Sequence, residues 1–268
     1  GLDALSDRKG AQAIAIRDRM PAGLDRQMLT WSIAMSGLSD VPAAEIAAAQ
    51  RQLQGWPGLK SFRANSEKAL FRENPAPSAV LSAFGNTAPE TTEAAMLLAR
   101  AHLATGDRSK AASLIRNLWR TEGLDEATED RVKGEFSGLL RPADHRARMD
   151  YLMYRERVGQ AKRFASLGEA QSLYRAWAGL ISKADNVGGL IQAVDGKWRN
   201  DPALLFIRIE NLRRQQKFEE AAKLLSQMPR DRAELVNTGA WWDEQRIIAR
   251  GLADQGQVRE AYRIVSRH

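Results

Sequence analysis

Cysteine is absent from the 268-residue chain. Its absence excludes a disulfide scaffold, a zinc site with thiolate ligands, a cysteine-bound iron–sulfur centre and a cysteine nucleophile. Apolar runs are short as well, and none approaches the roughly 18 residues that a membrane-spanning helix needs. Alternating runs of Val, Ile, Thr and aromatic residues are nearly absent, so strands are not expected. A helical protein without a membrane span remains.

Motifs that carry common chemistries are also missing. The three histidines, His102, His145 and His268, lie in different segments and form neither H-x-x-x-H nor H-E-x-x-H. The chain has no G-x-S-x-G elbow for a serine nucleophile and no glycine-rich loop for a phosphate or a dinucleotide. We therefore predict no metal, no cofactor and no catalytic residue in this chain.

Charge is plentiful and basic on balance, with 40 Lys and Arg against 33 Asp and Glu and a formal net charge of +7. A basic surface favours polyanionic partners. Nucleic acid is not expected, because the bases Arg213, Arg214 and Lys217 lack interleaved aromatic residues for base stacking. Hydrophobic residues make up 44% of the chain, which is typical of a folded protein. No linker stands out, so we expect residues 1–268 to form one continuous domain.

Apolar residues recur at the helical spacing of three and four positions along most of the chain. Asp201 and Pro202 form a clear helix start, with Asp as the N-cap and Pro at the first helical position. Three apolar stripes are the most regular. They are Ala111, Leu114, Ile115 and Leu118; Phe218, Ala221, Ala222 and Leu225; and Val258, Ala261, Tyr262 and Val265.

A short turn with the same layout precedes each stripe. Gly106, Gln216 and Gly256 each stand five positions before an alanine of the following stripe. The small alanine allows the second helix to approach the first closely, as in tetratricopeptide-like repeats. The three copies are unequally spaced, so no strict period exists. We predict an all-α fold, a right-handed, curved superhelix of about 14 to 17 helices in antiparallel pairs.

The seven tryptophans allow two interpretations. They can fill large gaps between small, alanine-rich helices, which is the interpretation we favour. Alternatively, an exposed indole can serve as a platform for the face of a sugar ring. The residues are Trp31, Trp56, Trp119, Trp177, Trp198, Trp241 and Trp242.

The end of the chain carries a series of residues that is typical of one protein family. A tryptophan pair is followed by Glu and Arg, and then by an Ala-Tyr pair near the closing His268. The series is Trp241, Trp242, Glu244, Arg250, Ala261 and Tyr262. It resembles the end of the α-superhelical domain of the soluble lytic murein transglycosylases of Gram-negative bacteria. Two departures are Gln245, where we expect Arg, and Gln216, where we expect the turn Gly.

Two earlier stretches resemble the same family. The first is similar to its Trp-Pro turn and the Arg/Glu helix that follows, and the second is similar to its central helices. The first stretch contains Trp31, Trp56, Pro57, Arg63 and Glu67. The second contains Asp144, His145, Arg148, Asp150, Tyr151 and Leu152.

The resemblance implies a periplasmic enzyme that cleaves peptidoglycan glycan strands between N-acetylmuramic acid and N-acetylglucosamine and leaves a 1,6-anhydro end. In the family, the catalytic Glu belongs to a Glu-Ser motif in a lysozyme-like domain C-terminal to the superhelix. This chain has no Glu-Ser pair. We therefore expect the U-shaped superhelical part alone, without lytic activity, in which the signature residues are structural. Its partners would be peptidoglycan, through the parent enzyme, and the missing catalytic domain.

A second interpretation is a TPR-like adaptor that binds a protein or peptide in its concave face. A regular period of about 34 residues would favour the adaptor, and it is missing. The motifs at Trp56-Pro57 and Trp241-Trp242 favour the transglycosylase part. The chain opens at Gly1 without an initiator Met, so we expect the natural protein to extend beyond it.

Overall fold

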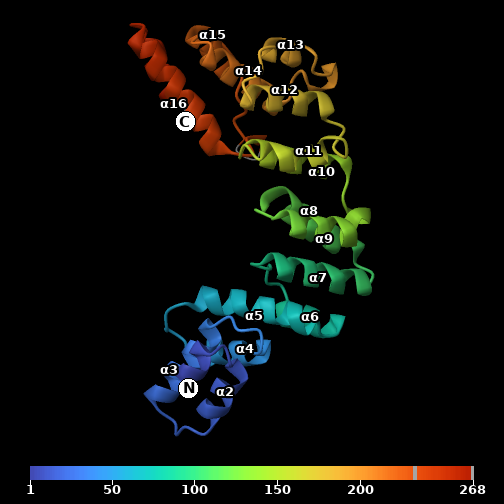
Figure 1. Cartoon of the computed structure of the whole chain (residues 1–268), viewed down its shortest axis with the longest axis vertical. Helices are drawn as coiled ribbons and strands as arrows, with labels where there is room; N and C mark the ends of the chain where they lie inside the picture. Colours follow the sequence, from blue (N-terminus) through green and yellow to red (C-terminus); the bar gives the residue numbers. More distant parts are fainter. Residues whose placement is uncertain (232–233, 267–268) are drawn as a thin grey trace. The chain divides into compact units, whose positions relative to one another are not determined.

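The structure is a computed structural model that describes residues 1–231 and 234–266. Over these residues it is 71% helical, contains no strand and comprises 17 α-helices packed in pairs (Figure 1). The prediction of an all-helical fold is therefore confirmed for the described part of the chain. The elements are α1 (Leu2–Ser6), α2 (Gly10–Asp18), α3 (Leu24–Met35), α4 (Ala43–Gln52), α5 (Leu59–Glu73), α6 (Pro77–Phe84), α7 (Thr92–Ala104), α8 (Arg108–Thr121), α9 (Glu126–Phe136), η1 (Ser137–Leu139), α10 (Pro142–Met153), α11 (Val158–Ala165), α12 (Gln171–Ile181), α13 (Val187–Gln192), η2 (Gly196–Trp198), α14 (Pro202–Arg214), α15 (Phe218–Leu225), α16 (Thr238–Asp254) and α17 (Val258–Val265).

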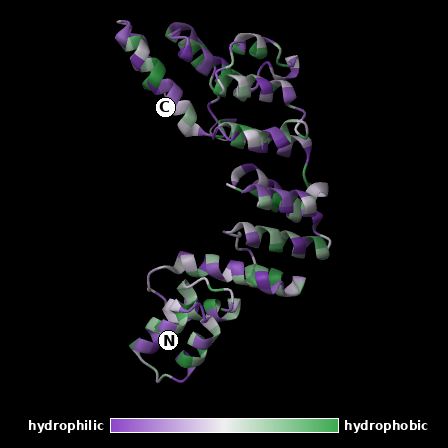
Figure 2. Cartoon of the chain, viewed as in Figure 1, coloured by the Kyte–Doolittle hydropathy of each residue, from purple (hydrophilic) through white to green (hydrophobic). Residues whose placement is uncertain are grey.

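Most helices present one apolar face to a neighbour, and hydrophobic and hydrophilic residues alternate along each ribbon in Figure 2. Two of the predicted stripes have the expected burial. In α8, Ala111, Ile115 and Leu118 are buried. In α15, the residues Ala221, Ala222 and Leu225 are buried, and Phe218 is partly buried. Helical periodicity was thus sufficient to identify the packing face of these two helices.

The predicted stripe of α17 is partly wrong. Ala261 and Ile264 are buried, whereas Val258 and Tyr262 are 65% and 70% exposed. The buried face of α17 is centred on Ala261 and Ile264, and α17 packs against α16. Ile264 lies three positions further on the same face, and Val258 and Tyr262 fall outside it.

The three predicted turns are confirmed, and they share one backbone geometry. Gly106, Gln216 and Gly256 have φ angles of +84°, +59° and +80°. In each turn the next residue donates its N–H to a carbonyl five positions back, as in Asp107 to His102 at 2.8 Å. This is the Schellman ending of a helix, which favours glycine because the left-handed conformation strains other residues. Gln216 adopts that conformation without being glycine.

The structure adds two copies of this turn that the sequence did not reveal. Arg8 and Glu156 have φ angles of +62° and +56°, and Ala13 and Ala161, five positions later, are fully buried. In all five copies the second helix begins two residues after the left-handed residue. The helices that these turns join also pack against each other in α1 and α2, α10 and α11, α14 and α15, and α16 and α17. The fifth turn joins α7 to α8.

The chain divides into two compact units, each with its own core. Unit 1 comprises Gly1–Leu118 and Asp130–Leu139, and unit 2 comprises Trp119–Glu129 and Leu140–His268. In unit 1, small and aliphatic side chains around Ile33, Ile46 and Phe62 fill the space between α1 and α5. The core of unit 2 is aromatic and is described below. The expectation of a single continuous domain stays a prediction.

Candidate functional site

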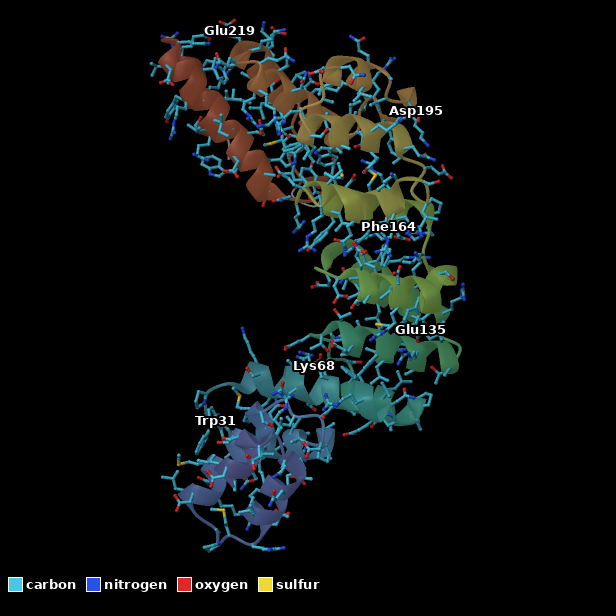
Figure 3. The ribbon with its side chains drawn as sticks, viewed as in Figure 1. Trp31, Lys68, Glu135, Phe164, Asp195 and Glu219 are labelled. Atoms are coloured by element: carbon cyan, nitrogen blue, oxygen red, sulfur yellow. The ribbon has the colours of Figure 1, made fainter. Side chains whose placement is uncertain are left out.

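Trp31 and the Trp56-Pro57 turn, which the family resemblance singled out, lie together in unit 1. The indole N–H of Trp31 donates to the carbonyl oxygen of Pro57 at 2.8 Å. Trp31 projects from α3, where it is labelled in Figure 3, and both tryptophans pack against the core of this unit. The bond fastens the turn before α5 to the side of α3. The contacts of these residues are therefore those of a structural junction.

Arg63 and Glu67 form a second junction, at the start of α7. The Glu67 carboxylate is 3% exposed and accepts the N–H groups of Glu90 and Thr91, the latter at 2.8 Å. Arg63 donates to Glu67 at 3.2 Å and pairs with the side chain of Glu90 at 2.9 Å. It also donates to the carbonyl of Ala88. A carboxylate suits this place because backbone N–H groups at a helix start have no intrahelical partner.

Trp241 belongs to a buried row of aromatic rings in unit 2. Its indole N–H donates to the Tyr154 hydroxyl at 3.2 Å, and its ring lies 5.1 Å from that of Phe206. Tyr154 in turn packs edge-on against Trp177 at 4.7 Å. Trp119, Trp177 and Trp241 are at most 1% exposed, so these three fill the core. Trp242 points the other way and is 38% exposed.

The remaining signature residues are divided between the interior and the surface. Glu244 is 4% exposed and accepts two hydrogen bonds from Arg213 on the neighbouring α14, at 2.7 and 2.9 Å. Arg250 and Tyr262 are exposed, and Ala261 is buried. Gln245, which stands where we expect Arg, is buried and donates to the sulfur of Met228. His268 lies outside the described residues.

Helix α10 carries four buried charged residues on an otherwise apolar segment. Two of them, Arg148 and Asp144, hold neighbouring elements. Arg148 and Glu129 are fully buried and pair at 2.7 Å, and Arg148 also donates to the Glu122 carbonyl at 2.5 Å. Asp144 accepts from the backbone N–H of Arg141 at 2.8 Å and pairs with Arg120. Burial favours the neutral acid, but these two donors keep the pKa of Asp144 below its ordinary value.

The other two residues of this set, Arg146 and Asp150, line a cavity of about 400 Å³ in unit 2. Arg146 donates to Asp150 at 2.9 Å and to both carboxylate oxygens of Asp201 at 2.9 and 3.1 Å. The guanidinium lies 4.4 Å from the centre of the Trp198 ring. Asp201 is also the predicted N-cap of α14 and accepts from the N–H of Ala203. The cavity walls thus come from α10, η2 and the start of α14.

The position of η2 depends on a separate contact. Ser172 donates to Asp195 at 2.8 Å, and the backbone N–H of Asp195 donates back to the Ser172 hydroxyl at 3.1 Å. Asp195, labelled in Figure 3, is the residue that precedes η2. On the opposite wall, a Cβ at Gly168 would lie 2.7 Å from the backbone nitrogen of Arg146, so only glycine fits there. The cavity is built by tight local contacts on two sides.

Asp150 is the most perturbed carboxyl group of this cavity. Burial raises its pKa to about 7, although Arg146 acts in the opposite direction. The nearby Asp201 adds to the rise. At neutral pH such a group is present both as acid and as carboxylate, so it can donate or accept a proton.

Sequence reasoning named Asp144, Arg148 and Asp150 as parts of a family-like stretch but missed Arg146 and its pairing with Asp201. The available signal was the alternation of charged residues along α10, where Asp144 to Asp150 places a charge at every second position. On a helix that spacing distributes charges over several faces. A helix with buried charges on several faces needs a polar partner for each charge. The four buried charged residues of α10 all have such partners.

Comparison with known proteins gives no match: no family profile, no curated protein and no solved structure is similar to this chain. Among the described helices, none combines the length and the hydrophobicity needed to cross a bilayer.

Proposed function

We propose that this chain is the non-catalytic, superhelical part of a periplasmic lytic transglycosylase that cleaves peptidoglycan. In this proposal the helix pairs follow one another in a right-handed, curved stack. The stack positions the catalytic domain and the glycan strand, and the chain itself cleaves nothing. The peptidoglycan and the catalytic domain of the parent enzyme are its partners.

The observation that carries the proposal is the ordered set of family-like motifs, from Trp31 to Tyr262. Several of the residues that the resemblance groups together in sequence are also in contact with each other. Trp31 bonds to Pro57, and Arg63 pairs with Glu67. The net charge of +7 supports the same partner, because the peptide stems of peptidoglycan carry carboxylates.

Three signature residues are exposed: Trp242, Arg250 and Tyr262. Arg250 makes no ion pair or side-chain hydrogen bond within the described residues. Its neighbour on α16, Arg246, pairs with Asp243 at 3.2 Å. The two arginines lie one turn apart on one helix, so they make a matched pair for mutagenesis.

The test is co-sedimentation of the folded chain with purified sacculi, with soluble anhydro-muropeptides monitored in the supernatant. We expect binding that weakens with added salt, and no muropeptide release. The Arg250→Gln variant should bind several-fold more weakly, whereas Arg246→Gln should bind like the wild type. Release of anhydro-muropeptides by the chain alone would contradict the non-catalytic assignment.

The adaptor is the second candidate, and one observation favours it. A hollow of about 840 Å³ beside α15, α16 and α17 is lined by Trp242, Met228, Pro229 and Ile264 among others. Arg230, Glu260 and Arg263 also line it, so it combines apolar and charged contacts, and grooves with an apolar part accept hydrophobic anchors of a peptide. If the chain neither binds sacculi nor releases muropeptides, the adaptor is favoured over the transglycosylase part.

A further inference from the structure

The cavity beside Asp150 has the features of a ligand site rather than of a packing gap. Its lining combines apolar residues with six charged ones. The apolar lining includes Pro142, Ala143, Ala147, Pro202 and Ala203. Three of the charged residues, Arg146, Asp150 and Asp201, are joined by hydrogen bonds. A mostly apolar hollow with a few fixed polar groups is typical of small-molecule sites.

Asp150 leaves one bonding position open toward this cavity. The residue is 8% exposed, and its Oδ1 accepts from Arg146 at 2.9 Å. Its Oδ2 accepts no hydrogen bond among the described residues, and Asp150 belongs to the lining of the cavity. This oxygen is not among the fully buried atoms that lack a partner, so it remains accessible to a donor that enters the cavity.

Arg146 pairs with two carboxylates of the protein itself. Its Nε donates to Asp150, and its Nη1 and Nη2 donate to the two oxygens of Asp201. This bidentate pairing uses the fork of the guanidinium on the protein's own carboxylate. The lining as a whole contains four acids, namely Asp150, Glu169, Asp201 and Glu234, and two bases, Arg146 and Lys197. Lys197 and Glu169 form a looser pair at the rim, at 3.7 Å.

We infer that this cavity binds an organic ammonium ion with a short apolar stem, whose charged nitrogen pairs with Oδ2 of Asp150. The stem lies against the prolines and alanines of the wall. The inference rests on the cavity alone and goes beyond the proposed function. An ammonium group satisfies the open oxygen and matches the acidic excess of the lining. A neutral sugar would offer hydroxyl groups to the same oxygen, and this alternative is one outcome of the test.

The proposed binding depends on pH in a defined direction. Six titratable or charged groups share the cavity with Asp150. They are Arg146 of α10, Tyr154 after α10, Lys197 of η2, Asp201 before α14, Glu169 before α12 and Glu234 before α16. The pKa of Asp150 is raised to about 7 by burial. A cation binds the ionised form, so the apparent affinity rises by about tenfold from pH 6 to pH 8. An alkylammonium ion stays charged over that range.

The experiment titrates the ¹⁵N-labelled 268-residue chain with n-butylammonium chloride, with n-butanol as the neutral match, and with N-acetylglucosamine as the neutral sugar. The reporter is the indole N–H signal of Trp198, assigned by its loss in Trp198→Phe. We expect a saturable shift with butylammonium, about tenfold tighter at pH 8 than at pH 6, and no saturable shift with butanol. Chloride is present throughout, so the effect belongs to the cation.

Two variants test the role of Asp150. Asp150→Asn keeps the shape of the side chain, and it should weaken binding at pH 8 at least tenfold and abolish the pH dependence. Glu220→Gln removes an exposed carboxylate outside the cavity and should leave both unchanged. If Asp150→Asn fails to fold, the test is the number of protons that the wild type releases when it binds butylammonium. Calorimetry in two buffers of different ionisation enthalpy measures that number. Equal shifts with butanol, pH-independent binding, or saturation only by N-acetylglucosamine would overturn the inference.

Discussion

The indole N–H of Trp31 donates a hydrogen bond to the carbonyl oxygen of Pro57, 26 residues further along the chain, at 2.8 Å. Trp31→Phe keeps a ring of similar shape and removes the donor. We expect a loss of about 1 kcal/mol in the free energy of unfolding, since a neutral hydrogen bond contributes that much. Trp56→Phe is the control, because the Trp56 indole makes no hydrogen bond within the described residues. Equal losses in the two variants, measured by guanidinium unfolding, would show that the bond contributes nothing.

Glu67 should stabilise the start of α7 through its charge. Glu67→Gln keeps one carbonyl oxygen for the N–H groups of Glu90 and Thr91 and loses the pairing with Arg63. We expect destabilisation by about 2 kcal/mol, because hydrogen bonds to charged groups are the stronger ones. Hydrogen exchange at the Glu90 and Thr91 amides should accelerate. Glu93→Gln, a neighbouring acid in the first turn of α7, should change neither quantity by more than a few tenths of a kcal/mol.

The strain at Gln216 should be removable. The residue has a φ of +59°, where a side chain costs about 1 kcal/mol relative to glycine. Gln216→Gly should therefore raise the free energy of unfolding by about that amount. The preceding Gln215 has a φ of −84°, so Gln215→Gly should lower stability by about 0.5 to 1 kcal/mol. Thermal unfolding of the two variants should shift the midpoint in opposite directions, and shifts of the same sign would refute the strain.

Asp150 should give the protein a characteristic loss of stability as the pH rises. The pKa of an unfolded aspartate is about 3.9, and burial raises that of Asp150 to about 7. The folded chain therefore holds the proton more tightly, and this contribution is complete below about pH 4 and disappears as the pH passes 7. Asp150→Asn lacks the effect. The stability difference, wild type minus variant, should fall by about 2 to 3 kcal/mol between pH 5 and pH 8.

Urea unfolding of both proteins at the two pH values measures that difference directly. Burial also raises the pKa of Glu210, but Glu210 is present in both proteins and its effect cancels in the comparison. A difference that is constant with pH would mean that Asp150 titrates in the fold as it does in the unfolded chain.

Gly251 allows the close approach of α16 to α15. A Cβ at this position would lie 2.5 Å from atoms of the Phe218 ring. Gly251→Ala should therefore cost about 1 to 3 kcal/mol, as overpacked cores do. Gly134 in α9 has nothing within 4 Å of the corresponding position, so Gly134→Ala should stabilise the chain by up to about 1 kcal/mol. If Phe218→Leu restores the Gly251→Ala variant, the clash is the cause.

The predictable parts of this fold are the local ones. The stripes around Ala111 and Ala221 and the N-cap at Asp201 were readable because they depend on residues within one or two turns. The copies of the turn at Arg8 and Glu156 were missed, because neither residue is glycine and, unlike Gln216, neither precedes one of the three regular apolar stripes. The only signal left in the sequence was the alanine that stands five positions after each of these two residues.

The candidate site was less accessible to sequence reasoning. Arg146 and Asp201 are 55 positions apart, and their pairing depends on where the fold places the start of α14 relative to α10. The shift of Asp150 depends on the same packing, because burial is its largest cause. No spacing rule relates such residues. A charged residue such as Asp150 within an apolar helix signals a partner without naming it.

In each turn, the buried alanine stands five positions after the residue in the left-handed conformation. This fixed spacing limits where residues can be added to the chain or removed from it. One residue inserted within that offset would rotate the alanine by about 100° away from the facing helix. Residues inserted between one helix pair and the next leave every offset intact, and the observed copies are indeed unequally separated. Tags, protease sites or labels are therefore best placed between pairs. Natural insertions and deletions are subject to the same constraint. This architecture therefore permits the gain or loss of whole helix pairs.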